Sequence, residues 1–252
     1  MPLGRKVAEE DICEADVVIY VISRISGEGK DRRRVKGDYY LSEREEEDLR
    51  YLAEMNKPVI LILNAGGPVE LTDILEQTDN IKGILNISQL GQEGGDALAD
   101  VLLGKEVPGG KLTTTWARRY EDYPASEEYG YLNGNLEKEK YKEGIYVGYR
   151  YFDSFDKKVM FPFGFGLSYT MFEMKCCSIN MEESKIRAEV QVTNTGNEYA
   201  GKEVVQIYVT LPQTELEKEY KRLAGFAKTR LLKPGETQTL TVEIPQKQLA
   251  SF

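Results

Sequence analysis

Short apolar runs alternate with amphipathic stretches over the first hundred residues. Val17–Ile22 and Val59–Leu63 are continuously apolar and rich in β-branched residues, which is typical of buried strands. Ile81–Ile87 is predicted to be a third strand. Between the first two runs, Ser42 and Glu45 have the spacing of a capping box, so a helix is expected to begin there. A succession of strand, helix and strand predicts a parallel sheet with helices on its faces.

Helical spacing of apolar residues supports three helices in this region. Pro58 is expected to stop the first helix, and Gly104 occupies the position after the last one where glycine is favoured. The apolar sets that would face the sheet are Leu49, Leu52 and Ala53 in the first helix, Val69, Ile74 and Leu75 in the second, and Ala97, Leu98, Val101 and Leu102 in the third.

The pattern changes after Pro108. Tyr120–Glu143 is polar, rich in Tyr and Glu, and has little apolar periodicity, so it is predicted to be a long loop. From about Met171 the apolar period becomes two, with turn signals at Asn194-Thr195-Gly196 and at Lys233-Pro234-Gly235-Glu236. The strands expected there are Lys185–Thr193, Glu203–Leu211, Arg222–Leu231 and Thr237–Ile244.

These patterns predict two domains. Residues 1–169 are expected to form an α/β domain, a three-layer sandwich with a largely parallel sheet. Residues 170–252 are expected to form an all-β sandwich of the immunoglobulin or fibronectin type, because short strands recur at close spacing.

Composition narrows the possible functions. The 252 residues include 33 Lys and Arg against 42 Asp and Glu, a formal charge of −9. This balance argues against a nucleic-acid partner, which needs a basic face, and against an anionic membrane surface. The longest apolar runs are also too short to span a bilayer.

Histidine is absent, which excludes Ser-His-Asp and Cys-His catalytic groups and any histidine-based zinc site. No metal signature or cofactor requirement is found. Cys13, Cys176 and Cys177 do not make a disulfide framework and are expected to be reduced, buried apolar filler. A reducing, cytoplasmic location fits these thiols.

The loop after the first predicted strand carries the main candidate for chemistry, since ligands of open α/β sheets bind beyond the carboxyl ends of strands. It contains Ser26-Gly27-Glu28-Gly29-Lys30-Asp31-Arg32. Arg24 and Asp31 stand where a phosphate-binding Walker loop needs glycine and Ser or Thr, and Arg32 stands where a dinucleotide loop needs glycine or alanine. Glu28 between two glycines could present a carboxylic acid for proton donation, or be a solvated glutamate in a flexible turn.

The residues that follow this loop allow two interpretations. The basic run Arg32-Arg33-Arg34 is either a solvated face or includes an arginine that pairs with Asp31 and fixes the loop. A nearby arginine would also hold the Glu28 carboxylate ionised, so its distance from Glu28 matters. The tyrosines of Tyr141–Tyr151 either stack on a sugar or contribute half-buried packing.

An ordered series of motifs over nearly the whole chain resembles the C-terminal half of glycoside hydrolase family 3, the β-glucosidase family. Phe161–Tyr169, which reads Phe-Pro-Phe-Gly-Phe-Gly-Leu-Ser-Tyr, is the most specific single match. The other matching segments are Ser23–Arg32, Gly91–Gly94, Ala97–Gly104, Pro108–Leu112 and Tyr141–Tyr151, with Asn194–Gly196, Gly201–Gln206 and Lys233–Glu236 in a region similar to the family's fibronectin type III-like domain.

The resemblance implies a role for one residue of this chain. Full enzymes of the family have a TIM-like barrel, then an α/β sandwich and often a fibronectin-like domain, and they hydrolyse terminal β-linked sugars with retention. Their nucleophile is an aspartate of the barrel, and no residue of this chain matches it. In many members the acid/base is the glutamate of the Ser-Gly-Glu-Gly loop, so the resemblance makes Glu28 the general acid/base.

Two functions therefore remain open. In the first, the chain is the C-terminal part of a retaining β-glycosidase, needs the barrel domain of the same enzyme as its partner, and is inactive on carbohydrate without it. In the second, it is a non-catalytic carbohydrate-binding or assembly module. An exposed apolar patch would favour the first and a polar surface the second. The sequence leaves the substrate-binding residues, the sugar, the linkage and the oligomeric state unassigned.

Overall fold

A computed structural model describes residues 12–25, 32–127, 137–138 and 141–250. The chain divides into two compact units, one of residues 1–98 and 117–134 and the other of residues 99–116 and 135–252. The predicted domain boundary between residues 169 and 170 stays a prediction.

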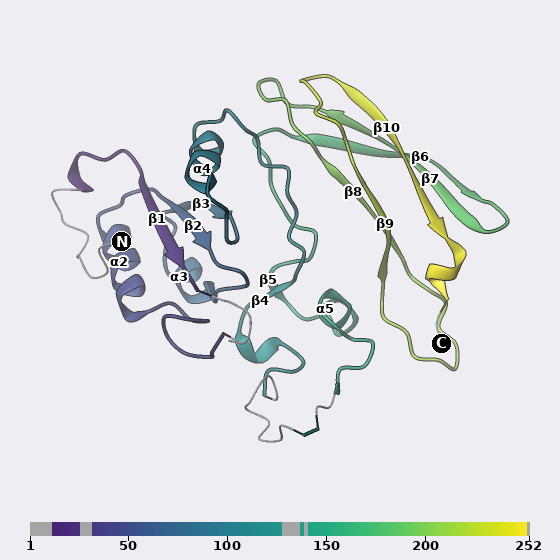
Figure 1. Ribbon diagram of the computed structural model, residues 1–252, viewed down its shortest axis with the longest axis horizontal. Coiled ribbons are helices and arrows are strands. Elements are labelled where there is room, and N and C mark those ends of the chain that lie inside the picture. Colours follow the sequence, from purple (N-terminus) through teal and green to yellow (C-terminus); the bar gives the residue numbers. More distant parts are fainter. Residues whose placement is uncertain (1–11, 26–31, 128–136, 139–140, 251–252) are drawn as a thin grey trace. The chain divides into compact units, whose positions relative to one another are not determined.

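The first unit contains a parallel sheet with the strand order β1-β2-β3 (Figure 1). The strands are close to the three predicted apolar runs, which are confirmed. Helices follow each of them, and none of the described helices is long and apolar enough to cross a membrane. The elements are β1 (Val18–Ser23), α2 (Glu43–Glu54), β2 (Val59–Asn64), α3 (Thr72–Gln77), β3 (Ile81–Asn86), α4 (Gly94–Leu102) and the 3₁₀ turn η1 (Tyr120–Asp122).

Helix α2 begins at the predicted capping box. The Glu45 backbone N–H donates to the Ser42 hydroxyl at 3.2 Å, and the Ser42 N–H donates to the Glu45 carboxylate at 2.8 Å. Leu49 and Leu52 are buried on the inner face of the helix. The Tyr20 hydroxyl of β1 donates to Asp48 of α2 at 3.1 Å, so α2 covers the sheet face to which Tyr20 points.

The other face of β1 is open to solvent. Val17, Ile19 and Val21 are 42%, 48% and 50% exposed, although each is a large aliphatic residue. Strands of parallel sheets are normally covered on both faces by helices. β1 therefore presents a row of apolar side chains, here named the β1 row, that the described residues leave uncovered.

The second unit contains a β-sandwich. An antiparallel sheet has the strand order β10-β7-β6, and β8 pairs with β9 in a second antiparallel sheet (Figure 1). The elements, with those that lead into the sandwich, are β4 (Trp116–Ala117), α5 (Tyr149–Ser154), β5 (Val159–Phe161), β6 (Phe172–Met181), β7 (Lys185–Asn194), β8 (Val204–Val209), β9 (Arg222–Lys228), β10 (Thr237–Pro245) and the 3₁₀ turn η3 (Gln246–Leu249).

Apolar residues from both sheets fill the sandwich. Val190 and Val192 of β7, Val205 of β8 and Leu240 of β10 form one buried cluster with Leu232. In β7 and β10 these residues alternate with polar ones, as the period of two predicted. The expected fold class, α/β followed by an all-β sandwich, is confirmed.

Several short elements were not predicted, and for two of the unpredicted elements, β6 and α5, the structure shows a local cause. Strand β6 carries a register shift between Cys176 and Ser178, and this β-bulge breaks the apolar alternation. Helix α5 spans only six residues and starts after Gly148, whose φ of 59° lies in the left-handed region that favours glycine.

The expectation of buried cysteines is wrong. Cys13, Cys176 and Cys177 are free thiols, and all three are exposed. Cys176 and Cys177 lie on β6, an edge strand whose neighbouring side chains are also exposed. The residue before Cys13, Ile12, is the one whose side chain is buried.

Asn194 accounts for the predicted turn between β7 and β8. Its buried side-chain oxygen accepts from the Thr170 hydroxyl at 2.6 Å and from the Gly196 N–H at 3.0 Å. Its amide nitrogen donates to the Tyr199 and Leu232 carbonyls, each at 2.9 Å. A Cβ atom at Gly196 would lie 2.0 Å from the Thr170 hydroxyl, so glycine is required for this close approach.

The variant Asn194→Ala should destabilise the sandwich by about 3 kcal/mol, because buried groups left without partners each cost about 1–3 kcal/mol. Urea unfolding measures the loss as a lower midpoint at an unchanged slope. Asn197→Ala is the matched control, since Asn197 is exposed in the same turn. Equal midpoints for the two variants would contradict this role of Asn194.

Candidate active site

The predicted acid/base Glu28 lies outside the described residues, as do its loop neighbours 26–31. Both flanks of this segment are described, and each carries an arginine. Arg24 directly follows β1 at its carboxyl end, and Arg32 is the first described residue after the segment. Sequence analysis singled out Glu45, the partner of Arg24, only as a helix-capping residue, and it did not single out Asp38, the partner of Arg32.

Arg24 is 6% exposed and is fully engaged. Its guanidinium makes a bidentate pair with Glu45 of α2, at 2.8 and 2.7 Å. It also donates to the carbonyls of Asp38 at 2.7 Å and Tyr40 at 3.2 Å. Burial raises the pKa of Glu45, but hydrogen bonds from Arg24 and from the Ser42 N–H outweigh it and lower the pKa overall. The pair is therefore ionised at neutral pH.

Arg32 binds the same short segment from the other side. Its Nε donates to the Asp38 carboxylate at 3.0 Å, and its Nη2 donates to the Asp38 carbonyl at 2.5 Å. Its Nη1 reaches the Pro68 carbonyl at 2.6 Å. Burial raises the pKa of the Asp38 carboxyl, but the Arg33 N–H and Arg32 lower it by more. Asp38, not Asp31, is thus the described partner of the basic run, and Asp31 lies outside the described residues.

The Asp38 carbonyl therefore accepts from both arginines. The chain on each side of residues 26–31 is tied to one point of the backbone, here named the Asp38 anchor. Each guanidinium also has its own carboxylate, Glu45 for Arg24 and Asp38 for Arg32. The Arg33 side chain, by contrast, is 73% exposed. Of Arg32 and Arg33, only Arg33 therefore fits the interpretation of a solvated face.

Tyrosines and charged groups surround the anchor within the same unit. The buried Tyr39 ring packs edge-to-face on Tyr40 and Tyr120, with centroids 5.5 and 5.0 Å apart. The Arg34 guanidinium lies over the Tyr120 ring at 4.8 Å and donates to the Tyr40 hydroxyl at 3.0 Å. Burial raises the pKa of Tyr39 far above its usual value, so its phenol stays neutral. The Glu70 carboxylate accepts from the Tyr120 N–H at 2.8 Å, which holds η1 to this cluster.

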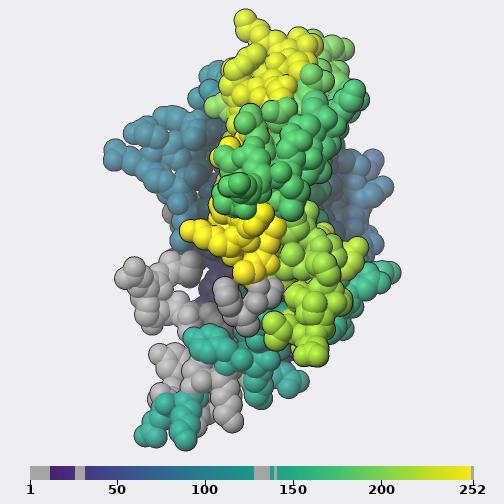
Figure 2. Space-filling model, turned by 90° about the vertical axis from the view of Figure 1, so that its right-hand side faces the viewer, coloured from purple at the N-terminus to yellow at the C-terminus, as the bar shows by residue number. Residues whose placement is uncertain are grey.

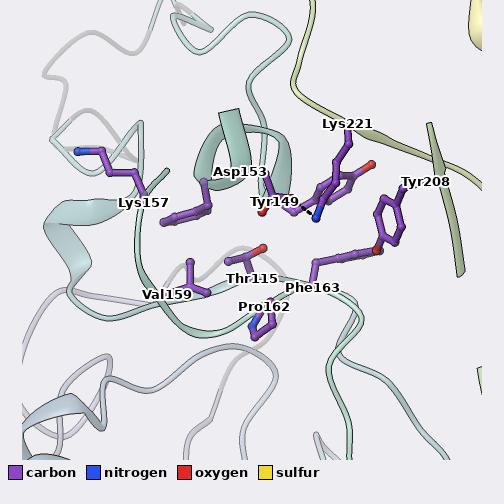
Figure 3. Close-up of a pocket in the computed structure, with 10 residues that line it drawn as sticks. Thr115, Tyr149, Asp153, Lys157, Val159, Pro162, Phe163, Tyr208 and Lys221 are labelled. Atoms are coloured by element: carbon purple, nitrogen blue, oxygen red, sulfur yellow. Dashed lines mark ion pairs between the residues drawn. The ribbon is translucent and has the colours of Figure 1, made fainter. Parts of the chain in front are cut away.

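The second unit has a separate small cavity of about 60 Å³ (Figure 3). Asp153 and Lys221 form an ion pair at its edge, 3.2 Å apart, and Lys221 lies 5.1 Å from the centre of the Tyr208 ring. The Tyr149 hydroxyl accepts from the Leu223 N–H at 2.7 Å. Sites for drug-sized ligands measure about 300–1,000 Å³, so this cavity is too small for them.

The tyrosines of residues 141–151 differ in their surroundings. Tyr149 stacks on Phe163 with centroids 4.8 Å apart, and Tyr146 packs on Phe155 at the same distance. Tyr141 is 82% exposed. Packing therefore accounts for Tyr146 and Tyr149. No group of three Cys, Asp or Glu side chains that could hold a metal is found among the described residues.

Comparisons with protein families identify two regions. Residues 4–149 match the glycosyl hydrolase family 3 C-terminal domain, and residues 203–252 match the fibronectin type III-like domain. The expected resemblance is confirmed by both.

Among curated relatives, beta-glucosidase A of Butyrivibrio fibrisolvens is 40% identical over 94% of this chain and 33% of its own length. A beta-glucosidase of Ruminococcus albus is 37% identical over 100% of this chain and 26% of its own length. The chain thus spans about a third or less of the length of these relatives.

Solved structures agree with this assignment. Beta-glucosidase 3B of Thermotoga neapolitana in complex with glucose has a TM-score of 0.88 and 44% identity, over 96% of this chain and 34% of that one. A beta-glucosidase of Paenibacillus barengoltzii has a TM-score of 0.91 and 38% identity, over 96% of this chain and 27% of that one. Because the family match covers more than half of its residues, this chain belongs to glycosyl hydrolase family 3, within the C-terminal domain of that family.

Proposed function

We propose that this chain supplies the general acid/base, Glu28, and one wall of the active site of a retaining β-glycosidase that acts on terminal β-linked sugars. The observation that carries the proposal is the Asp38 anchor, which ties both flanks of residues 26–31 at the carboxyl end of β1. Acid catalysis needs a group held in place, and the two flanking residues, Arg24 and Arg32, are both held at this carbonyl.

Charge balance near the anchor supports an acid rather than a permanently ionised carboxylate. A free guanidinium close to Glu28 would lower its pKa and keep it from carrying a proton. The Arg24 charge is balanced by Glu45 and the Arg32 charge by Asp38. Both flanking cations are therefore paired with carboxylates, and Asp38 is shared with Arg33 at 4.0 Å. In the proposed mechanism Glu28 holds the proton for the leaving oxygen.

Retaining hydrolysis needs a second carboxylate about 5 Å from the first, to act as nucleophile. The proposed source is the barrel domain of the full-length enzyme, since the relatives are three or more times as long as the matched region. In the first step the nucleophile attacks the anomeric carbon while Glu28 protonates the departing oxygen. In the second, Glu28 takes a proton from water, which attacks the glycosyl-enzyme and releases the sugar.

The β1 row favours this function over a stand-alone module. Val17, Ile19 and Val21 are large apolar residues at alternate positions on one sheet face, and all are about half exposed. Contiguous exposed apolar surface marks an interaction site, and a parallel strand is normally covered on both sides. We infer that polypeptide of the full-length enzyme covers this face. The cavity of the second unit, at about 60 Å³, is too small to support a carbohydrate-binding module.

Three free thiols support a reducing, cytoplasmic location for the enzyme.

The purified chain of 252 residues is predicted to be inactive on an aryl β-glucoside, because it contains one of the two carboxyl groups that the reaction requires. Release of the aryl alcohol, followed by absorbance, should equal that of the variant Glu28→Gln. Saturable turnover by the chain that Glu28→Gln abolishes would contradict this prediction.

In a chimera, residues 1–252 replace the matching third of beta-glucosidase 3B. There, Glu28→Gln should lower kcat by about 10²–10⁴-fold on glucosides with poor leaving groups. On a dinitrophenyl glucoside, whose leaving group needs no proton, kcat/KM should change little. The kcat on that substrate should fall because Glu28 no longer takes the proton from water in the second step, and azide should restore it by replacing water. A uniform loss of kcat/KM on both substrates, without azide rescue, would show that Glu28 is not the acid/base.

Arg32→Gln should lower kcat of the chimera on poor leaving groups by about 10- to 100-fold, because a misplaced catalytic group loses rate on that scale. The kcat/KM on the dinitrophenyl glucoside should change little. Arg33→Gln is the matched control, since the Arg33 side chain is 73% exposed and that of Arg32 is 14% exposed. Equal effects of the two variants would contradict a positioning role for the Asp38 anchor.

A further inference from the structure

The β-bulge near the middle of β6 changes which of its residues point to each face of the sheet. Before the bulge, Met174 pairs with Val192 of β7, and after it Ile179 pairs with Ala188. Paired residues of antiparallel strands point to the same side, and Val192 and Ala188 are both buried in the sandwich. Even-numbered residues of β6 therefore point inward before the bulge, and odd-numbered residues point inward after it.

Among the described residues, the outer edge of β6 has no strand beside it. The strand order β10-β7-β6 places β6 last in its sheet, and β6 forms its backbone ladder with β7 alone. Figure 2 shows this sheet, in green and yellow, at the surface of the molecule. An unpaired edge of ten residues exposes N–H and C=O groups that another strand can use.

The sequence of β6 is complementary to itself when two copies run antiparallel about the point between Cys176 and Cys177. Each residue before this point is then opposite the residue at the same distance after it in the second copy. Inward apolar residues meet inward apolar residues, and outward polar residues meet outward polar residues. The pairs are Phe172 with Met181, Glu173 with Asn180, Met174 with Ile179, and Lys175 with Ser178.

The bulge is what makes this register possible. In a regular strand, residues at equal distances from a point between two neighbours point to opposite faces, because side chains alternate. The extra residue in β6 shifts the alternation by one, so the faces match on both sides of the point. A shift of the pairing by one residue in either direction would place inward residues opposite outward ones. No pair in the matched register brings two like charges together.

We propose that β6 is a dimerisation edge, at which two copies of this chain pair their β6 strands antiparallel about a two-fold axis between Cys176 and Cys177. The two three-stranded sheets then join into one continuous sheet. The occupant is a second copy because this strand matches itself in face, polarity and charge. A two-fold interface closes on itself, so the product is a dimer and not a fibre. The inference does not depend on the role of Glu28.

The first test changes the charge at Asn180, which is exposed and would lie opposite Glu173 of the second copy. Asn180→Lys should lower the dimer Kd and Asn180→Glu should raise it, each by about 2- to 30-fold, because the charge pair occurs twice in the dimer. Sedimentation at low salt measures both. Adding Glu173→Lys to Asn180→Glu should restore the Kd. Arg187, which pairs with Asn180 within the chain, is present in monomer and dimer alike, so its effect cancels.

The second test reads the register through the exposed thiols. Two chains, both with Cys13→Ser, carry either Cys176→Ser or Cys177→Ser, and one is isotope-labelled. In their mixed dimer the two remaining thiols lie opposite each other, whereas in either unmixed dimer each thiol lies opposite a serine. Oxidised glutathione takes up the two electrons and two protons that a thiol pair loses, and becomes two glutathione molecules.

Mass spectrometry should then find the disulfide between unlike chains in at least about tenfold excess over disulfides between like chains, because a disulfide needs closely placed Cβ atoms. Disulfides in statistical proportions would overturn the proposal. A chain that sediments as a monomer at every concentration would overturn it too. So would a dimer whose Kd is the same for Asn180→Lys and Asn180→Glu, since another surface would then hold the two copies together.

Discussion

One backbone carbonyl receives two guanidinium groups, and the geometry of the proposed site depends on it. The Asp38 carbonyl accepts from Arg24 at 2.7 Å and from Arg32 at 2.5 Å. Charge-assisted hydrogen bonds of this kind are stronger than neutral ones. Because one arginine precedes residues 26–31 and the other follows them, the same atom restrains both ends of the segment that holds Glu28. Glu45 links this restraint to the start of α2, since it both caps that helix and pairs with Arg24.

Burial of that network requires balanced charge. An unpaired guanidinium as little exposed as Arg24 would be costly, and a buried pair that loses one partner leaves the other uncompensated. The carboxylates of Glu45 and Asp38 remove this cost and, in the proposed mechanism, also shield Glu28 from two positive charges. The same contacts therefore serve stability and proton donation.

The two units share a second physical feature, which is apolar surface at the edge of a sheet. The β1 row lies along an edge strand, and the edge strand β6 likewise exposes Met174, Ile179 and Met181. Single exposed apolar residues are common on proteins, but a row at alternate positions on one face is the pattern of a surface that packs against something. For the β1 row we attribute the missing cover to polypeptide of the longer family chain.

Much of the fold could be predicted from the sequence, because its signals are local. The apolar run Val59–Leu63 and the capping box of Ser42 and Glu45 act over a few residues, and both were confirmed. Strand β6 could not be predicted, because a bulge at Cys176 disrupts its period.

The site was harder to predict than the fold. Glu28 was indicated by a motif, but the Asp38 anchor uses a backbone carbonyl, which every residue possesses and no sequence pattern marks. A lone arginine at the carboxyl end of a buried strand, such as Arg24, was the one signal available.

The most direct test is a crystal structure of the chimera with beta-glucosidase 3B, bound to glucose. The account predicts a Glu28 carboxyl oxygen at about 3 Å from the anomeric hydroxyl, and about 5 Å between the Glu28 carboxyl and the barrel carboxylate. A Glu28 side chain turned away from the sugar, and paired instead with Arg24 or Arg32, would contradict it.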